Sequence, residues 1–407
     1  MLKHLLPLGT RDEFGRRART KQHLIAVIQA HFKQRGLAPI ATPLLENEAV
    51  FDPYQMGNYQ LYRLFGNDGR TLVLRPDMTL PVARFISATN VPLPQKFGYV
   101  GDIFRVSRQL SGSYNQITQA GVELVGYASL KAEFECLTIA NQLSSELIAD
   151  AVEIELGDAQ FAQRVVASLT GDEGEQQAIL TALFDKQVPR YTKLIAKYRA
   201  QPLYDFLKAW PRLFGRPECI FKELAAALLP ETVQPSLKRL QTVVAWMQQT
   251  MPEQVISVDL SSQAPQKYYT GLTFRGYSQA GAGYLFSGGR YDKLLTNFQA
   301  EAEPAVGMGL NVDLLTTLAT DQQTAYAEQL IYFEPEQLIY FEPEQLIYFE
   351  PEQLIYFEPE QWSQAEAYLA KQPHAILSLA DDLAGARIEA QCLNAQLIDL
   401  TGGMTND

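Results

Sequence analysis

Two short segments carry acidic, amide and hydroxyl side chains at spacings that suit the binding of an amino group. The hexapeptide LRPDMT places Asp77 and Thr79 just after an apolar run, and QAGVE places Gln119 and Glu123 four residues apart. Residues four apart on a strand point to the same face, so Gln119 and Glu123 can reach one cleft. A carboxylate and a hydroxyl at a strand end can hold an ammonium group through charge-assisted hydrogen bonds. We therefore expect these side chains to line a polar pocket.

Each of these segments also has a purely structural interpretation. Asp77 can pair with Arg75 or cap a helix that follows it, and Gln119 and Glu123 can lie on a solvated strand face. The solvated face is the weaker alternative, because Val122 beside them has the character of a core residue. For Asp77, the hexapeptide alone leaves the choice between ligand contact, ion pair and cap open.

An aromatic pair and a glycine-rich segment follow later in the chain. Tyr268 and Tyr269 precede Thr270 and Gly271, and an aromatic pair in a strand is more often core packing than part of a site. Residues 287–295, SGGRYDKLL, contain two glycines that permit backbone conformations and close approaches which a side chain would block. Both segments gain weight only in combination with the first two.

Hydrophobic spacing predicts the elements that position these residues. Residues 16–33 place apolar side chains on one helical face and predict an amphipathic helix. Residues 37–46 predict a strand, and residues 61–65 and 71–74 predict a hairpin around a glycine-rich turn. Residues 99–126 read as an arginine-bearing strand, a polar turn and a return strand. The chain therefore begins with a helix, a strand and then hairpins.

The middle of the chain has a different pattern. Residues 161–249 are rich in Ala, Leu, Gln and Lys and predict a helical insertion. Strand character returns at residues 255–260 and 272–277, and residues 305–318 predict the beginning of the last core helix. Residues 374–400 predict a short α/β unit at the end.

Four identical tandem copies of the octapeptide EQLIYFEP occupy residues 328–359. A solenoid unit has about 20 to 50 residues, whereas eight residues with a proline can form only a short strand and a turn. We interpret three copies as surplus, with a functional device as the alternative. An even period preserves side-chain facing, so any copy can take the same sheet position, and looping out the others changes the free energy by about 1 kcal/mol. We therefore expect register heterogeneity.

Bulk properties restrict the class of protein. With 407 residues and 47% hydrophobic content, the chain suits two or three globular domains. No stretch approaches the roughly 18 apolar residues of a membrane span, and three widely spaced cysteines favour a reducing cytoplasm over a disulfide framework. The net charge of −12 disfavours nucleic acid only weakly, because surplus repeat copies contribute −6 of it. The four histidines lack ligand spacing, so we predict no metal site.

Taken together, these segments resemble the histidyl member of the class II aminoacyl-tRNA synthetases. LRPDMT is similar to the LRPE-G-T of that family, and YYTG and GGRYD occur in the same order. The hairpin has five residues in register with the family, namely Phe104, Arg105, Gln119, Gly121 and Glu123. The resemblance covers about residues 1–320 and implies an α+β fold, an antiparallel sheet flanked by helices. It also implies dimerisation through the first helix and the proline-bearing strand.

The resemblance divides the chain and assigns a pocket. It implies a synthetase-like core in residues 1–155 and 251–324, a helical insertion in residues 156–250, and a C-terminal remnant in residues 325–407 that includes the repeat. The implied histidine-like pocket is formed by Asp77, Thr79, Arg105, Gln119, Glu123, Tyr268 and Tyr269.

Departures from the synthetase pattern fall on the nucleotide side of that pocket. Ala264 stands where the family has an arginine before the tyrosines, and Leu314 stands where an arginine grips ATP. The other replacements are Lys267 for an aspartate, Asn311 for a glycine, Ser107 for a glutamate, Ser113 for an arginine and Ile117 for the aromatic that stacks on adenine. One arginine of this kind can contribute about 10³ or more in rate. The retained Arg105 can bind an anion, but it does not by itself make an adenylating site.

A pocket that binds an amino acid without activating it suits a sensor, and the pattern resembles the family of ATP phosphoribosyltransferase regulatory subunits. The resemblance implies no catalysis and no cofactor, and a role in the first step of histidine biosynthesis with histidine as feedback effector. It implies a hetero-oligomer with the short-form catalytic subunit, a hetero-octamer being one arrangement, and a self-dimer through the core. A cytoplasmic protein without nucleic-acid or membrane partners is expected. The alternatives are a working histidine–tRNA ligase and another synthetase-like ligand-binding protein.

Overall fold

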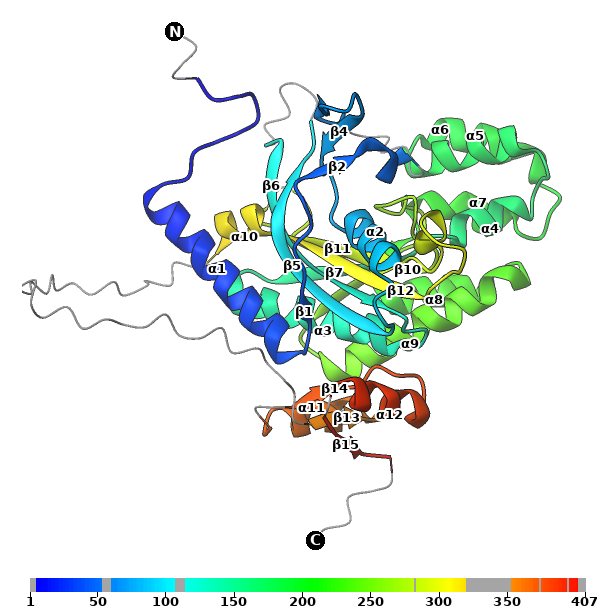
Figure 1. Ribbon diagram of the computed structural model, residues 1–407. Helices are drawn as coiled ribbons and strands as arrows, with labels where there is room; N and C mark the ends of the chain where they lie inside the picture. Colours follow the sequence, from blue (N-terminus) through cyan, green and yellow to red (C-terminus); the bar gives the residue numbers. More distant parts are fainter. Residues whose placement is uncertain are drawn as a thin grey trace, which may run out of the picture.

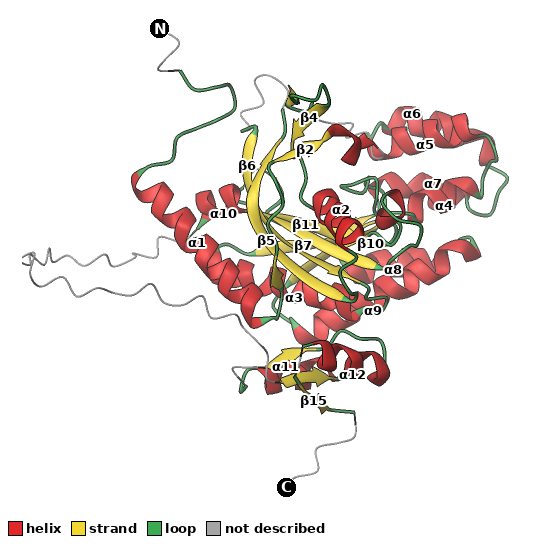
Figure 2. Ribbon diagram, in the orientation of Figure 1, coloured by secondary structure: helices red, strands yellow, loops and turns green. Residues whose placement is uncertain are grey.

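A nine-stranded sheet forms the centre of the molecule (Figures 1 and 2). The computed structural model describes residues 5–52, 60–106, 114–281, 283–319, 353–372, 375–393 and 395–401. The strand order is β1-β5-β6-β12-β11-β10-β7-β9-β8, and its pairs are antiparallel except β1 with β5 and β7 with β9. The strands are β1 (Ala38–Pro39), β5 (Gln95–Phe104), β6 (Gln116–Val125), β7 (Val152–Asp158), β8 (Phe214–Gly215), β9 (Val255–Asp259), β10 (Leu272–Ser278), β11 (Phe286–Arg290) and β12 (Ala305–Asn311). The predicted α+β fold is confirmed.

The long hairpin of β5 and β6 separates two cores. Their register pairs Gln95 with Val125 and continues without interruption to Phe104 and Gln116. On β6, Ala120, Val122 and Leu124 are buried in the larger core, whereas Val125 packs with a second cluster on the opposite face. This period of two follows from the pleat of a strand, and it places Glu123 on the same face as Val125.

Helices lie on both faces of the large sheet, among them α1 (Gly15–Gln34), α3 (Lys131–Leu147) and α10 (Val312–Leu318) against the larger core and α2 (Thr79–Thr89) on the face of Glu123. Helices α1, α3 and α10 contact one another or the large sheet. Helix α1 buries Leu24, Ile28 and Phe32, each contributing about 1.5–3 kcal/mol of burial free energy. Helix α2 contributes its buried side chains to the second cluster. The helix predicted over residues 16–33 is confirmed, and its chain leaves through Gly36 at a positive φ of 70°.

Two local predictions were wrong. Residues 37–46 form no continuous strand but two short ones, β1 and β2 (Leu45–Asn47), because Pro39 and Pro43 supply no N–H for a ladder. Residues 305–318 begin as strand β12 rather than as helix, and α10 starts only after Asn311. The side chain of Asn311 accepts a hydrogen bond from the Leu314 N–H at 3.0 Å, which is a helix N-cap.

A second, small sheet carries the chain into the site. It has the order β2-β4-β3, with β3 (Arg63–Phe65) and β4 (Thr71–Leu74) antiparallel, as the sequence predicts. The Gly69 N–H donates to the Gly66 carbonyl at 3.0 Å, and Gly69 adopts a positive φ of 78° that favours glycine. Strand β4 then ends three residues before Asp77, the residue that caps α2.

A helical segment lies between β7 and β9. Its helices are α4 (Phe161–Ala167), α5 (Glu173–Phe184), α6 (Val188–Ile195), α7 (Tyr204–Ala209), α8 (Pro217–Ala226) and α9 (Gln234–Thr250). Their buried side chains, including Trp210 and Leu240, belong to the same cluster as the core of the sheet. None of the helices in the described ranges is long and apolar enough to cross a membrane.

The C-terminal unit is a three-stranded parallel sheet with two helices. The order is β14 (Ala375–Leu377), β13 (Gln353–Tyr356) and β15 (Gln396–Asp399), with α11 (Trp362–Leu369) and α12 (Leu383–Cys392). The fourth copy of the octapeptide thus forms the central strand, with Leu354 and Ile355 fully buried. Copies one to three, residues 328–351, lie outside the described residues, so register heterogeneity stays a prediction.

Buried polar contacts join the C-terminal unit to the core. Arg35 at the end of α1 donates to Glu135 of α3 and to Glu366 of α11, the latter at 2.7 Å from Nη2. Lys131 Nζ donates to the Ala380 carbonyl at 3.0 Å, and the Trp362 ring packs edge-on against Phe134 with centroids 5.7 Å apart. Removing one partner of a buried ion pair is strongly destabilising, so the contacts of Arg35 tie the C-terminal unit to the core.

Candidate functional site

The loop between β4 and α2 places Asp77 at the entrance of α2. Asp77 Oδ1 accepts the Leu80 N–H at 3.0 Å, while Oδ2 lies 3.4 Å from the hydroxyl of Tyr268. The capping alternative is therefore present, yet it uses one oxygen and leaves the other facing the tyrosine. Pairing with Arg75 does not occur, because the Arg75 guanidinium donates to the carbonyls of Asp102 and Thr42.

Glu123 lies at the centre of the site, on the face of β6 that α2 covers. Its Oε1 accepts a hydrogen bond from Thr79 Oγ1 at 2.7 Å, and its Oε2 accepts one from the Tyr291 hydroxyl. The Tyr99 hydroxyl also interacts with this carboxyl group. Only 1% of the Glu123 residue is exposed. Hydroxyl groups on three separate elements therefore hold one buried carboxyl group.

Glycines of β12 make room for the side chains of β6. Gly307 pairs with Glu123 in the ladder, and a Cβ built on Gly307 would overlap the Glu123 carboxylate. A Cβ on Gly309 would likewise overlap the amide of Gln119. The polar side chains of β6 thus lean across backbone that carries no side chain, which is the close approach that glycine permits.

Three tyrosine rings form the wall beside Glu123. The ring centroids of Tyr268 and Tyr269 are 5.2 Å apart, those of Tyr268 and Tyr291 5.7 Å, and those of Tyr269 and Tyr291 6.5 Å. Edge-on and tilted geometries at these separations are favourable for aromatic pairs. Because Tyr291 also donates to Glu123, the aromatic wall and the carboxyl group form one unit.

Burial determines the electrostatics of the site. Loss of hydration raises the pKa of Glu123 to about 8, against the opposing effect of its hydroxyl donors and with a smaller contribution from Asp77. Burial also raises the pKa of Asp77, which the nearby Arg105 partly offsets. The pKa of Tyr291 is raised well above its usual value by burial and by Glu123. Within the described part of the chain, Glu123 forms no ion pair.

The structure brings most of the predicted pocket residues together. Asp77, Thr79, Glu123, Tyr268 and Tyr269 share hydrogen bonds or ring contacts with one another or with Tyr291. Gln119 lies on the same face of β6 over Gly309, and Arg105 Nε donates to the Pro76 carbonyl at 2.7 Å, beside Asp77. Whether these side chains bind a ligand stays a prediction.

Sequence reasoning missed two residues of this cluster, Tyr99 and Tyr291. Tyr291 lies within the GGRYD string, and its contact with Glu123 joins residues 168 positions apart. Tyr99 pairs with Gly121 across the hairpin, and a Cβ on Gly121 would overlap the Tyr99 ring. The available signal was the glycine opposite an aromatic residue, since such a pair lets the ring lie across the strand.

Within the described residues, several positions at which the resembled family binds the nucleotide carry neutral or apolar side chains. Leu314 packs against the larger core, and Asn311 is engaged in capping α10. Ile117 packs against the cluster of Met78, Tyr99 and Ile103. Ser107 and Ser113 lie outside the described residues. No group of three or more His, Cys, Asp or Glu side chains suitable for a metal ion occurs in the described ranges.

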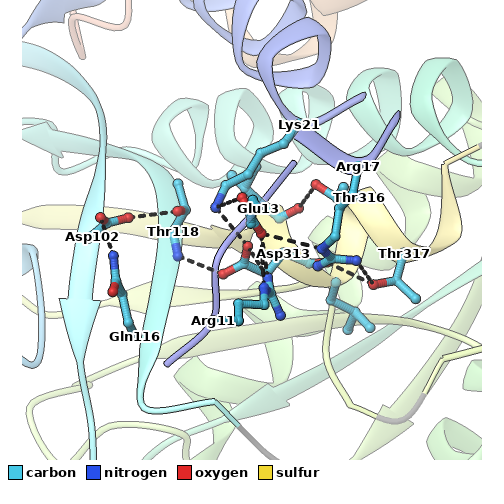
Figure 3. Close-up of polar contacts among 12 residues, drawn as sticks. Arg11, Glu13, Arg17, Lys21, Asp102, Gln116, Thr118, Asp313, Thr316 and Thr317 are labelled. Carbon is cyan, nitrogen blue, oxygen red and sulfur yellow. Dashed lines mark hydrogen bonds and ion pairs between the residues drawn. The ribbon is translucent and has the colours of Figure 1, made fainter. Parts of the chain in front are cut away.

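A charged cluster around Asp313 contacts the hairpin near the start of β6 (Figure 3). Asp313 in the first turn of α10 accepts the Thr118 N–H of β6 at 2.8 Å. The same carboxylate is contacted by Arg11 at 2.6 Å and by Lys21 Nζ at 2.9 Å, so it joins the N-terminal segment, α1 and β6. In the resembled family this helix carries an arginine that binds ATP. Here it carries Asp313, whose carboxylate contacts Arg11 and Lys21.

Comparisons with known proteins show the family to which the chain belongs. The family profile described as histidyl-tRNA synthetase matches residues 9–315. An ATP phosphoribosyltransferase regulatory subunit from Lactiplantibacillus plantarum is 94% identical over 407 residues, 100% of both chains. One from Lacticaseibacillus casei is 43% identical over 396 residues, 97% of both chains.

Solved structures show the same fold at low sequence identity. An ATP phosphoribosyltransferase regulatory subunit/histidyl-tRNA synthetase from Bacillus halodurans aligns with a TM-score of 0.70 at 23% identity, covering 98% of both chains. Histidyl-tRNA synthetase from Nostoc aligns with a TM-score of 0.65 at 18% identity, covering 98% of this chain and 92% of that one. A chain of the ATP phosphoribosyl transferase (HisG:HisZ) complex from Thermotoga maritima aligns with a TM-score of 0.56 at 17% identity, covering 72% of this chain and 97% of that one. With its full-length relatives, this chain belongs to the family of ATP phosphoribosyltransferase regulatory subunits, built on the histidyl-tRNA synthetase fold.

Proposed function

We propose that this chain is a non-catalytic regulatory subunit of ATP phosphoribosyltransferase, the first enzyme of histidine biosynthesis. In this role it supports the short-form catalytic subunit and transmits feedback inhibition by histidine. It uses no cofactor of its own and acts in the cytoplasm without nucleic-acid or membrane partners. The name shared by its full-length relatives supports the assignment to this enzyme.

One structural observation carries the non-catalytic part of the proposal. The amino-acid side of the pocket keeps two buried carboxyl groups and an aromatic wall, while Leu314, on the nucleotide side, packs in the apolar core. Activation of ATP needs cations that act on phosphate charge in the transition state. A pocket with this asymmetry can bind a free amino acid, but it cannot stabilise a nucleotide transition state.

In this proposal, histidine takes one orientation in the cluster. Its ammonium group lies near Asp77, whose Oδ2 faces Tyr268, and its imidazole ring lies among the tyrosines beside Glu123. For a feedback effector, the free energy of histidine binding must be coupled to the state of the partner. A coupling of about 1–3 kcal/mol gives a 5- to 150-fold response, and linkage makes it reciprocal.

Two contacts with other chains belong to the proposal. A hetero-oligomer with the catalytic subunit, in which a hetero-octamer is one arrangement, is supported by the name of the Thermotoga maritima complex. A self-dimer through the core is supported by exposed apolar side chains at its N-terminal end, among them Leu8 (82% exposed), Phe14 (94%) and Phe65 (85%). Large apolar groups left in water commonly mark a surface that a partner covers.

Reconstitution with a short-form catalytic subunit tests the proposal. Mixing the two chains should give transferase activity that histidine inhibits, and Glu123→Ala should weaken both histidine affinity and inhibition. Glu253→Ala, which removes an exposed carboxylate outside the pocket, is the matched control and should change neither. Weaker affinity with unchanged inhibition would place the regulatory site elsewhere.

The competing function, a histidine–tRNA ligase, has its own assay. A ligase catalyses histidine-dependent exchange between ATP and pyrophosphate, and we expect no exchange above background from the purified chain. Measurable exchange, or charging of tRNA, would contradict the non-catalytic assignment.

A further inference from the structure

We propose that bound histidine and Glu123 together hold a single proton, so that a neutral imidazole ring enters the pocket and meets a protonated carboxyl group. The inference rests on the proposed function and deepens it, since it states which form of the ligand the pocket selects. Its basis is the set of groups that surround Glu123.

The partners of Glu123 are donors without charge. Thr79 and Tyr291 donate hydroxyl hydrogen bonds to its two oxygens, and Tyr99 adds a third hydroxyl. No Lys, Arg or His in the described ranges lies within ion-pair distance of this carboxyl group. Burying an isolated carboxylate is far more costly than burying a neutral acid, so the empty pocket favours the protonated form.

The aromatic wall identifies which end of histidine meets Glu123. Tyr291 donates to Glu123 and stacks edge-on with Tyr268, so the carboxyl group lies at the aromatic end. Asp77 lies at the start of α2, where its Oδ2 faces the Tyr268 hydroxyl and Arg105 is close enough to favour its charge. Because Asp77 has a cation nearby and Glu123 has only hydroxyl partners, we assign the ammonium group to Asp77 and the imidazole ring to Glu123.

Other titratable groups interact electrostatically with Glu123. They are Asp77 before α2, Tyr99 on β5, Tyr268 and Tyr269 before β10, Tyr291 after β11 and Cys136 on α3. Burial raises the pKa of each tyrosine and of Cys136 well above the usual value, so all five stay neutral. Glu123, with a pKa of about 8, titrates in the physiological range. Burial also raises the pKa of Asp77, and the nearby Arg105 partly offsets this rise.

The shared proton fixes the pH dependence of binding. Free imidazole titrates near pH 6.5 and Glu123 near pH 8, so the separated partners carry about one proton between them near pH 7. The affinity for histidine is then greatest near pH 7. On either side it decreases, and the decrease approaches tenfold per pH unit. A side chain that enters as a cation, such as that of lysine, must expel the Glu123 proton, which weakens binding about tenfold at pH 7.

Calorimetry of histidine binding to the full chain, in pairs of buffers with different ionisation enthalpies, measures the protons exchanged. We expect release of about three-quarters of a proton at pH 6, almost none near pH 7.2, and uptake of about three-quarters at pH 8.5. The α-ammonium group of free histidine also loses part of its proton at the highest of these pH values. Glu123→Gln is therefore the reference, and the difference between the two proteins at this pH isolates the Glu123 proton.

A second variant keeps the test independent of how well Glu123→Gln folds. Tyr291→Phe removes a donor that lowers the pKa of Glu123, so the pH of zero net exchange should move upward. Release of about one proton at pH 7.2, or equal uptake by wild type and Glu123→Gln at pH 8.5, would overturn the shared proton while leaving histidine binding intact. No binding of histidine at any pH would overturn the proposed function itself.

Discussion

Two groups of buried glutamates differ in what neutralises them. Behind the sheet, Glu133 receives two hydrogen bonds from Arg290, at 2.7 and 2.6 Å, and Glu135 receives two from Arg35. In the pocket, Glu123 is equally buried but receives its hydrogen bonds from hydroxyl groups. The same side chain in the same degree of burial thus occurs with a built-in cation in one region and without one in the other.

The difference separates support from recognition. For Glu135, burial alone would raise the pKa, but Arg35 outweighs it and the pKa is lowered. For Glu123, burial outweighs the hydroxyl donors and the pKa rises to about 8. A carboxylate with its own arginine is complete when the chain folds. A buried carboxyl group without one, and with a raised pKa, is a candidate for a binding site, which is the role that the proposed function gives to Glu123.

The largest effect should come from removing a cation behind the sheet. Arg290→Met leaves Glu133 buried without its partner, and breaking such a pair from one side destabilises a protein by about 3–5 kcal/mol. Urea unfolding followed by circular dichroism measures the change. Arg63→Met is the control, since Arg63 is 54% exposed in its pair with Glu48 and should lose less than about 1 kcal/mol.

A small loss in Arg290→Met, similar to that of the control, would remove the distinction between the two regions. It would mean that Glu133, like Glu123, is accommodated without an arginine partner. The comparison predicts instead that Glu133 depends on its arginine, whereas Glu123 is stable with hydroxyl donors alone.

The next effect is a pH dependence of opposite sign in the two regions. Because the folded-state pKa of Glu123 is raised from 4.5 to about 8, its contribution to stability is complete below pH 4.5 and is lost as the pH rises through 8. Glu123→Gln should therefore gain on wild type by up to about 1.4 kcal/mol per pH unit between pH 5 and 8. Urea titrations at each pH measure this gain.

Glu135→Gln provides the contrast for that experiment. The folded-state pKa of Glu135 is lowered, so its contribution is present above its unfolded-state pKa and is lost as the pH falls through the folded-state value. The variant should be most destabilised at neutral pH and should approach wild type only in acid. Parallel pH profiles for Glu123→Gln and Glu135→Gln would show that the arginine makes no difference.

Local sequence patterns predict the helix and the hairpin that position the site, but they do not predict the contacts between its buried side chains. The helix over residues 16–33 and the hairpin over residues 99–126 follow from spacing that a few neighbouring residues define. The role of Tyr291 depends on a partner 168 positions away, and the Arg290–Glu133 pair spans 157 positions. Such pairings arise only when the sheet order is known.

Glycine explains the error over residues 305–318 and also the shape of the pocket. The apolar residues of AVGMGLN continue into the following helix and predict one continuous element. Gly307 and Gly309 instead belong to a strand that pairs with β6. Glycine in a strand often marks a place where another group approaches closely. The close approach here is made by Glu123 and Gln119, which sequence alone could not place over that backbone.

A smaller effect concerns a single hydroxyl group of the pocket. Thr79→Val keeps the shape of the side chain and removes its 2.7 Å hydrogen bond to Glu123, which should lower stability by about 0.5–1.5 kcal/mol. The loss should be smaller at pH 5 than at pH 8, because a charged acceptor depends more on its donors. Thr192→Val removes an exposed hydroxyl that bonds only to the Val188 carbonyl and serves as the control. A loss that is the same at both pH values would show that Glu123 does not change charge in this range.

The smallest effect should come from deleting residues 328–351, which removes three octapeptide copies and leaves the one that forms β13. The deletion does not touch the contact between Arg35 and Glu366. The free energy of unfolding, measured by thermal denaturation, should therefore change by no more than about 1 kcal/mol, the difference expected for a longer loop.

The deletion also tests whether copies can replace one another. Ile355→Asp places a charge in a fully buried strand position, and it should be severely destabilising in the single-copy chain but milder in the four-copy chain, where an intact copy can take the strand. Equal losses of stability in the two chains would mean that only the fourth copy can form the strand. The turn into α11 would then determine the register, although the four copies have the same sequence.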